Sequence, residues 1–414
     1  MMAVLLLGCL SALADGPVTI TFWDENAGPN RTPYYEELIA KFETLHPEIH
    51  VEYVGLPWSD AKSKYDVAIQ SKTTPDCGGV SQDWICDFII KNALVPIDTY
   101  FDNWSEKDDL VASYITDLHN MAPDGKLYAI LNTANIPVLW YRADRIAQPI
   151  TWDDVFAEAE ESTDLANNIY GFSIRGGSGS TRLLEQMIYS YSGITEMFDE
   201  NGKSTVNDPL HVEFVEKLAS MYNRLTPESD ITNGYKEMVA AFDTGVANMI
   251  CHNLGSYGEH SQTLEPGQYM AATGLKSKKG NANVVTNGSI CYSIFNTSEH
   301  PEEAFTFISY LCEAEQNSFW NEKVGQLPTS KKALESDYAK NAQHIADAAA
   351  TTADPTTTVV CVPIWIPGYS DMMEELIPKF QQVLLGEMSA QTFMDGWADQ
   401  ITTLKAEFDL YFAK

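Results

Sequence analysis

The first clear pattern in the chain is an apolar run that ends in a polar, aromatic loop. Residues 18–22 alternate like a short strand, and Trp23, Asp24 and Asn26 follow. Residues 34–46 then carry apolar side chains at helical spacing. A strand, a polar loop and a helix make the first unit of an open α/β sheet, where ligands bind beyond the carboxyl ends of strands. The loop is therefore predicted to form one wall of a ligand cleft.

The alternation of strand and helix patterns continues along the chain. Residues 49–54 alternate like a strand, and 58–72 read as a helix. Thr151 and Asp154 form a capping-box pattern at the start of another helix. This order predicts βαβ units with parallel strands. The absence of a low-complexity linker predicts two lobes that share one crossing chain. Further strands are expected at 76–80, 127–131, 137–141, 170–175, 246–251 and 290–295.

Composition and charge narrow the class of protein. The chain has 414 residues, of which 44% are hydrophobic, and its formal net charge is -32. The length allows two or three domains with ample core. The acidic balance argues against binding of nucleic acid, whose phosphates require clustered Lys and Arg. It otherwise describes a well-solvated surface and identifies no ligand.

The N-terminus has the pattern of an export signal. Residues 3–10 are apolar but too short to span a bilayer, and 12–14 read Ala-Leu-Ala. We therefore expect residues 1–14 to be a signal peptide and the protein to be exported to the periplasm. The alternative is that residues 6–9, Leu-Leu-Gly-Cys, act as a lipobox. That reading places a lipid anchor on Cys9 at the outer face of the cytoplasmic membrane.

Cysteine spacing and motif searches give little support for metal or cofactor chemistry. Cys77 and Cys86 are the only close pair, and the sequence leaves open whether they form a disulfide. No CxxC motif occurs, and Pro47 separates His46 from His50, so no metal site is expected. The Gly-rich stretch 176–181 lacks both nucleotide-binding patterns. No GxSxG elbow is present, and no cofactor is predicted.

The residue types at the presumed strand ends favour a carbohydrate ligand. Aromatic rings pack on the apolar faces of a pyranose, and Asp, Asn, Gln and Arg pair with neighbouring hydroxyls. For any single Trp, a place in the core is at least as good an interpretation. The predicted ligand-binding residues are Trp23, Asp24, Asn26, Gln82, Asp83, Trp84, Asn132, Asn135, Arg175, His252, Asn253, Asn287, Trp365 and Tyr369.

Several segments, in order, resemble bacterial extracellular solute-binding proteins of sugar ABC importers, family 1, the maltose-binding-protein-like group. The matching segments are 20–24, 35–53, 81–98, 124–141, 151–154, 170–177, 242–250 and 301–328. The resemblance implies a two-lobed α/β periplasmic-binding-protein fold (type II). Each lobe would be a mostly parallel sheet flanked by helices, with a hinge between the lobes. At 251–255 the chain departs from the aromatic turn of many relatives, so no aromatic platform is expected there.

The resemblance also implies a division of the chain and a function. The N-terminal lobe would comprise residues 15–127 and 277–327, and the C-terminal lobe 128–276 and 328–414. The protein would be a non-catalytic, monomeric receptor that captures a mono- or oligosaccharide and delivers it to a membrane permease. Two alternatives stay open. One is an exported carbohydrate-active enzyme that uses a carboxylate pair, and the other is a receptor for a non-sugar solute such as a glycerol phosphate derivative.

Overall fold

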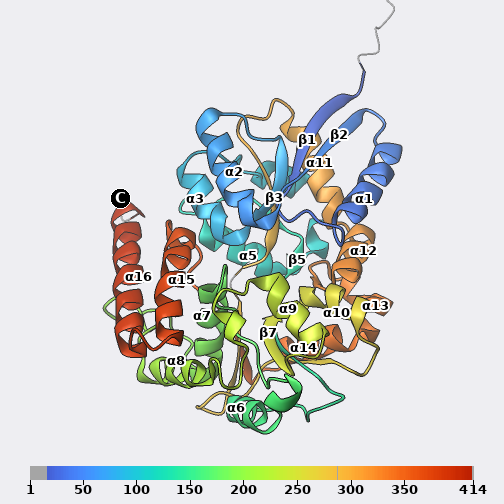
Figure 1. Ribbon diagram of the computed structural model, residues 1–414. Helices are drawn as coiled ribbons and strands as arrows, with labels where there is room; N and C mark the ends of the chain where they lie inside the picture. The colour runs from blue at the N-terminus through green and yellow to red at the C-terminus, as the bar shows by residue number, and fades with distance from the viewer. Residues whose placement is uncertain (1–15, 287, 413–414) are drawn as a thin grey trace, which may run out of the picture.

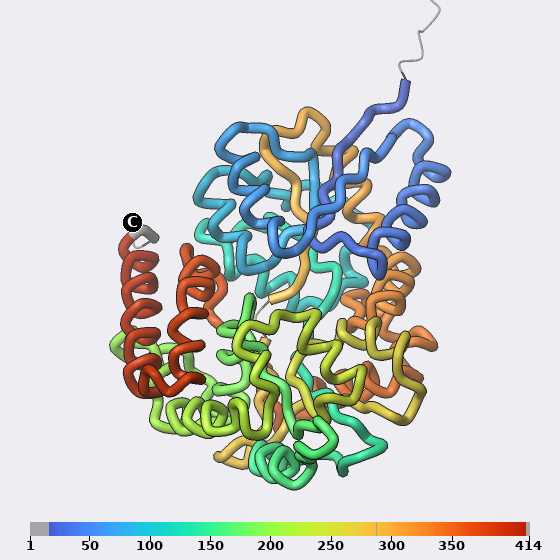
Figure 2. Tube along the Cα trace, in the orientation of Figure 1, coloured from blue at the N-terminus to red at the C-terminus, as the bar shows by residue number. Residues whose placement is uncertain are grey.

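Two α/β lobes lie one above the other, joined by crossing segments of the chain. The computed structural model describes residues 16–286 and 288–412. In Figure 1 the upper lobe combines the blue and cyan N-terminal part with orange segments, and the lower lobe contains the green, yellow and red parts. The tube in Figure 2 passes between the lobes more than once. The predicted two-lobed fold is therefore confirmed. The predicted signal peptide lies outside the described residues.

The upper lobe contains a five-stranded sheet. Its first three neighbouring strands run parallel, as the βαβ pattern predicts, whereas β10 runs antiparallel to both of its neighbours. The reversal occurs because β10 enters this sheet after the chain has returned from the other lobe. The strand order is β2 (Ile49–Gly55), β1 (Val18–Asp24), β3 (Cys77–Ser81), β10 (Ile290–Ile294) and β4 (Ile130–Leu131).

The helices of the upper lobe cover this sheet. In α1 the apolar stripe expected from the sequence is buried, with Leu38 and Phe42 in the core. These helices are α1 (Thr32–Leu45), α2 (Trp58–Ser71), η1 (Gln82–Trp84), α3 (Ile85–Ile90), α4 (Asp98–Asn103), η2 (Lys107–Asp109), α5 (Ala112–Met121), α11 (Pro301–Cys312) and α12 (Ala314–Val324).

The lower lobe corrects the expectation of mostly parallel sheets. Its central strand, β6, is antiparallel to both neighbours, while β9 and β12 pair in parallel. The segment 170–174 forms only isolated parallel bridges, although a strand was predicted there. The strands of this lobe are β6 (Pro137–Tyr141), β7 (Met249–Asn253), β8 (Met270–Ala272), β9 (Ala282–Thr286) and β12 (Thr357–Cys361).

Helices surround the lower lobe on several sides. The capping box predicted at α6 is present, since the Asp154 amide donates to Thr151 Oγ1 (3.1 Å) and the Thr151 amide donates to Asp154 Oδ2 (2.8 Å). These helices are α6 (Trp152–Glu161), η3 (Leu165–Asn167), α7 (Ser180–Ser192), α8 (Pro209–Met221), η4 (Glu228–Ile231), α9 (Tyr235–Asp243), η5 (Leu254–Ser256), α10 (Tyr257–Thr263), η6 (Ala333–Glu335), α13 (Asp337–Asn341), α14 (Gln343–Ala353), α15 (Tyr369–Leu384) and α16 (Ala390–Phe412). None of the described helices is long and apolar enough to cross a membrane.

Each lobe has its own hydrophobic core. The core of the upper lobe contains buried apolar residues from 20–131 and 291–324. The core of the lower lobe contains most buried apolar residues from 134–285 and from 327 onward. Val284 and Val285 of β9 belong to the core of the lower lobe. The lobe boundaries predicted from the sequence stay a prediction, and the core membership of β9 favours a crossing point a few residues later than expected.

The crossing segments are fixed by side-chain amides. The Asn132 carbonyl accepts hydrogen bonds from Asn317 Nδ2 (2.7 Å) and Asn321 Nδ2 (3.1 Å), and Asn132 Nδ2 donates to Tyr292 Oη (2.7 Å). Two short strands, β5 (Thr133–Ala134) and β11 (Leu327–Pro328), pair beside this point. Three parts of the chain therefore meet at one buried place between the lobes, where a hinge was expected.

All six described cysteines are free thiols. Cys77 and Cys86 are buried and do not form a disulfide, which answers the question that the sequence left open. Cys251, Cys291 and Cys312 are also buried among apolar neighbours, whereas Cys361 on β12 is exposed. The buried thiols therefore act as small hydrophobic side chains of the two cores.

Candidate functional site

The end of β1 places two adjacent carboxyl groups at the surface between the lobes. Asp24 and Glu25 are both fully buried. Asp24 accepts hydrogen bonds from Tyr53 Oη (2.7 Å) and from the Asn26 amide (3.1 Å). Burial raises the pKa of Asp24, and burial together with the charge of Asp24 raises the pKa of Glu25 to about 7. Gly79 leaves the space for Glu25, because a Cβ there would collide with its carboxylate.

A guanidinium group lies beside this acidic pair. Arg31, at the N-terminus of α1, has Nη2 3.7 Å from Glu25 Oε1, and its guanidinium covers the ring of Trp320 at 4.9 Å. Both Glu25 oxygens and Arg31 Nε lack a hydrogen-bond partner. The first wall of the site thus combines carboxylate, guanidinium and indole groups whose hydrogen bonds are only partly used.

The lower lobe supplies a second polar wall. Tyr235, the first residue of α9, stacks its ring against His252 with 4.5 Å between centroids. Burial and the neighbouring Glu259 raise the pKa of Tyr235, whereas the charges of Arg175 and Arg31 lower it. Tyr235 is therefore within electrostatic range of an arginine of each lobe, Arg175 and Arg31.

One side of the interlobe contact contains a set of side-chain amides and a glycine, and we call it the amide edge: Asn30, Gly255, Gln262 and Gln326. Gln262 Nε2 donates to Asn30 Oδ1 (3.2 Å). Gly255 permits close approach, since a Cβ there would lie 2.5 Å from Gln326 Nε2. Side-chain amides and small residues thus bring α10 and η5 against the N-terminal lobe and its crossing segment.

Several buried polar atoms on elements that border the lobe contact have no hydrogen-bond partner. Buried polar groups are normally paired, so a run of unpaired atoms indicates a place for water or ligand. The atoms include both donors and acceptors, a mixture that complements hydroxyl groups. The run consists of Glu25 Oε1 and Oε2, Arg31 Nε, Trp320 Nε1, Asn321 Oδ1, Gln326 Oε1, Thr133 Oγ1 and Asn135 Oδ1.

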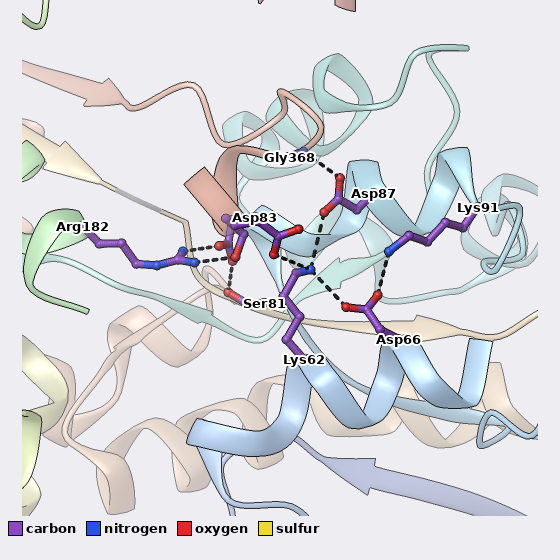
Figure 3. A network of polar contacts seen from close by, with 10 residues as sticks. Lys62, Asp66, Ser81, Asp83, Asp87, Lys91, Arg182 and Gly368 are labelled. Atoms are coloured by element: carbon purple, nitrogen blue, oxygen red, sulfur yellow. Dashed lines mark hydrogen bonds and ion pairs between the residues drawn. The ribbon is translucent and has the colours of Figure 1, made fainter. Parts of the chain in front are cut away.

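The opposite side of the contact is ionic, and we call it the ionic edge: Lys62, Asp83, Asp87, Arg182, Gly368 and Asp371. Figure 3 labels all of these residues except Asp371. Asp83 and Arg182 form an ion pair between η1 and α7. Lys62 Nζ lies 3.2 Å from Asp371 Oδ1, and the Gly368 amide donates to Asp87 Oδ1 (3.1 Å). Arg182 also donates to Ser370. Helices α2 and α3 are thus tied to α7 and α15 across the gap between lobes.

The predicted site residues fall into separate groups. Gln82 and Asn135 meet at the crossing, where Gln82 Oε1 accepts from the Ser289 amide and the Asn135 amide donates to Ser289 Oγ. The structure also buries Asn132 there. His252 packs on Tyr235, and the charge of Arg175 acts on both rings. Asp24 belongs to the wall of the upper lobe, where it accepts from Tyr53 and from the Asn26 amide. Asn253 forms the turn before η5.

Other predicted residues lie away from this group. Trp23 packs against Tyr65 at 5.3 Å, and Trp84 stacks on Trp58 at 5.3 Å within the upper core. Tyr369 is fully buried and donates to Glu185. Trp365 packs against the lower core. Asp83 is engaged by Arg182, as described above, and Asn287 lies outside the described residues. Ligand contact by any predicted residue stays a prediction.

Important residues were missed by the sequence reasoning. Glu25 directly follows Asp24, so two adjacent carboxyl groups at the end of a predicted strand could have pointed to it. Tyr235 could have been noticed as an aromatic residue that opens a helix after Gly234. Arg31 and Arg182 gave no local signal, because the groups that define their roles lie on other elements. Among the described residues, no group of three or more His, Cys, Asp or Glu side chains could hold a metal ion.

Comparison with known proteins identifies the class to which this geometry belongs. Residues 37–347 match the model of the bacterial extracellular solute-binding protein family, and the chain belongs to that family. The family binds solutes and is not catalytic, which agrees with the prediction of a non-enzyme and overturns the alternative of a carbohydrate-active enzyme. A Brucella abortus protein described as a binding protein is 24% identical over 403 residues, which cover 94% of this chain and 93% of the relative.

Solved structures share the fold at low sequence identity. The GacH receptor of Streptomyces glaucescens, solved unliganded and with acarbose, matches with a TM-score of 0.79 at 20% identity, covering 95% of this chain and 99% of that chain. The maltose-bound MalE3 of T. maritima matches with a TM-score of 0.80 at 19% identity, covering 94% and 100%. A Deinococcus radiodurans protein named as a probable ABC transporter-binding protein is 23% identical over 212 residues, 48% of this chain and 50% of that protein.

Proposed function

We propose that this protein is the substrate-binding component of a sugar ABC import system. It captures a mono- or oligosaccharide between its two lobes and delivers the sugar to membrane permease subunits. The observation that carries the proposal is the run of unpaired buried donors and acceptors from Glu25 to Gln326 on elements that border the lobe contact. A hydroxyl group both donates and accepts, so a sugar can satisfy such a mixed set.

Likenesses to known proteins support this proposal. Proteins of the same fold are named for acarbose and maltose, and a relative is named as an ABC transporter-binding protein. A sugar gains contacts with both walls only when the lobes close, so its differential affinity favours the closed form. A permease that recognises the closed form would receive only loaded receptor. We further propose that the protein acts as an exported monomer, either free in the periplasm or anchored through Cys9.

The test is isothermal titration calorimetry of the whole protein with a panel of mono- and oligosaccharides. We expect saturable binding of at least one sugar, weakened at least tenfold by Glu25→Gln or Gln326→Ala. Glu160→Gln is the matched control, because Glu160 pairs with Arg224 on the exposed surface. Failure of the whole panel to bind, or equal binding by the control and the Glu25→Gln variant, contradicts the proposal.

A further inference from the structure

Arg175 differs from the other arginines in its partners. The chain has six arginines. Arg145 donates to the Gly245 carbonyl (2.8 Å) and to Asn248 Oδ1 (3.1 Å). Four others form ion pairs within the described residues: Arg31 with Glu25, Arg142 with Asp144, Arg182 with Asp83, and Arg224 with Glu160. Among the described residues, Arg175 has neither a paired carboxylate nor two neutral oxygen acceptors.

The Arg175 guanidinium makes a single hydrogen bond within the described part of the chain. Its Nε donates to the Ser178 carbonyl (2.5 Å), and no described carboxylate lies within 4.0 Å. Glu374 and Glu237 act on it only at longer range, and burial lowers its pKa to about 10. The side chain is half-buried, and its Nη groups carry no protein partner among the described residues. Once a solute and the closed lobes exclude water from it, this cation requires a counter-charge or a full set of acceptors. Its own chain provides neither.

The position of Arg175 makes its unused hydrogen-bonding capacity relevant to ligand binding. The guanidinium folds over Gly179, whose left-handed backbone (φ 77°) and missing Cβ leave the space. Tyr235 lies nearby and connects Arg175 to the wall formed by the N-terminal lobe. Ser180, which begins α7, is buried, and its hydroxyl has no partner. A charged and an uncharged donor with unused capacity thus occur together at the start of α7.

The acidic residues of the site do not supply the missing charge. Asp24 is bonded by Tyr53 and Asn26, Glu25 lies against Arg31, and Glu259 is engaged by Tyr235 and Asn30. A neutral hydroxyl could accept from Arg175 but would leave its charge uncompensated. A carboxylate or phosphate oxygen does both, with the planar, paired geometry that guanidinium groups favour.

We propose that the solute carries an anionic group, a carboxylate or a phosphate ester, on its hydroxylated skeleton, and that Arg175 receives this group. The inference rests on the proposed function and narrows it from sugars to acidic sugars. It assigns Arg175 as the residue that selects for charge, while the unpaired groups from Glu25 to Gln326 select for hydroxyls.

The experiment uses matched sets of probes with the whole protein. Calorimetric titrations would compare glucose, galactose and mannose with their uronic acids and their 6-phosphates. We expect an acidic member of one set to bind at least tenfold more tightly than its neutral parent. The uronic acids and the 6-phosphates distinguish the two sources of anionic charge, and a preference for either supports the inference.

Variants show whether Arg175 is the cause. Arg175→Gln should reduce the difference between acidic and neutral members of a set to less than threefold, with the neutral sugar affected little. Arg175→Lys should keep part of the preference, because the charge remains. Arg224→Gln is the control and should leave the difference unchanged, since Arg224 pairs with Glu160 on the exposed surface. A circular dichroism spectrum equal to that of the parent excludes misfolding.

The outcomes separate this inference from the proposed function. Tighter binding of the neutral sugars overturns the inference and leaves sugar binding intact. An acidic preference that survives Arg175→Gln overturns the assignment of Arg175. Binding of none of the neutral or acidic sugars contradicts the proposed function, and the inference falls with it.

Discussion

The two edges of the interlobe contact use different chemistry. At the ionic edge, charged side chains from α2, η1 and α3 meet α7 and α15. At the amide edge, Asn30 accepts from Gln262 (3.2 Å) and also engages the Glu259 carboxylate, beside a close approach at Gly255. Ion pairs depend on salt and on burial, whereas amide contacts depend on short-range geometry. The same closed arrangement is therefore held by forces that respond to different conditions.

The largest effect is expected from breaking the buried pair of the ionic edge. Arg182→Met leaves the fully buried Asp83 carboxylate without its counter-charge. The loss of one partner of a buried pair costs about 3–5 kcal/mol. Urea denaturation should show this loss, and small-angle scattering should show a larger radius of gyration without ligand. The double variant Asp83→Asn/Arg182→Met should recover much of the stability, and its failure to do so would mean that packing, not charge, is lost.

A pH series compares the carboxyl groups that lie behind each edge. Burial raises the pKa of Glu185, behind the ionic edge, to about 8, and that of Glu25, near the amide edge, to about 7. Their ordinary pKa is 4.5, so the folded state holds protons that the unfolded state releases. Stability is then full below about pH 4.5 and decreases as pH rises through these folded values, by on the order of 3–5 kcal/mol per group.

Glu25→Gln and Glu185→Gln should each flatten this decline in the free energy of unfolding, measured by urea denaturation at pH 5, 6, 7 and 8. A stability that stays constant over this range in the parent protein would contradict the raised pKa values. Because Glu25 also lies beside Arg31, its variant tests the amide side of the comparison, and Glu185→Gln tests the ionic side.

A smaller effect is expected at the amide edge. Gln262→Ala removes the hydrogen bond to Asn30 and should shift the balance toward the open form by about 1 kcal/mol. The shift should be the same in 50 mM and 500 mM salt, roughly below and well above the ionic strength that screens surface charges. Fluorescence energy transfer between labels on the two lobes measures it. A strong dependence on salt would remove the distinction between the edges.

The smallest effect is expected from the exposed part of the ionic edge. Asp371 is 67% exposed, so its pair with Lys62 is well screened. Asp371→Asn removes only this pair and should shift the lobe equilibrium by about 0.5 kcal/mol at low salt and by nothing measurable at high salt. The same energy-transfer assay measures this change. An effect as large as that of Arg182→Met would show that the whole network acts as one unit.

Local patterns predicted much of the fold and little of the site. The buried stripe of α1 and the capping box of α6 were visible because they depend on residues close in sequence. The strand expected at 170–175 forms only isolated bridges, and β10 runs against its neighbours, because pairing is decided by segments far away. Arg182 and Asp83 are 99 residues apart in sequence, and nothing near either one predicts their contact.

Dependence on distant segments also explains why the sequence could not separate core tryptophans from those beside the candidate site. Composition could not distinguish Trp84, which stacks on Trp58 in the core, from Trp320, which lies under Arg31 in the site. Both rings stand among mixed polar and apolar neighbours along the chain. Only the arrangement of helices places a guanidinium and unpaired amides beside one indole and not the other.

The free cysteines can report the order in which the two cores unfold. Of the six described thiols, only Cys361 is exposed. Cys77, Cys291 and Cys312 belong to the core of the upper lobe and Cys251 to that of the lower lobe. A thiol reagent added to folded protein should therefore mark Cys361 first and the others only as each core opens. Mass spectrometry of labelled peptides over time would record the upper lobe through Cys77 and Cys291 and the lower lobe through Cys251. The order in which the two cores unfold can thus be measured with the native cysteines, without introducing new ones by mutation.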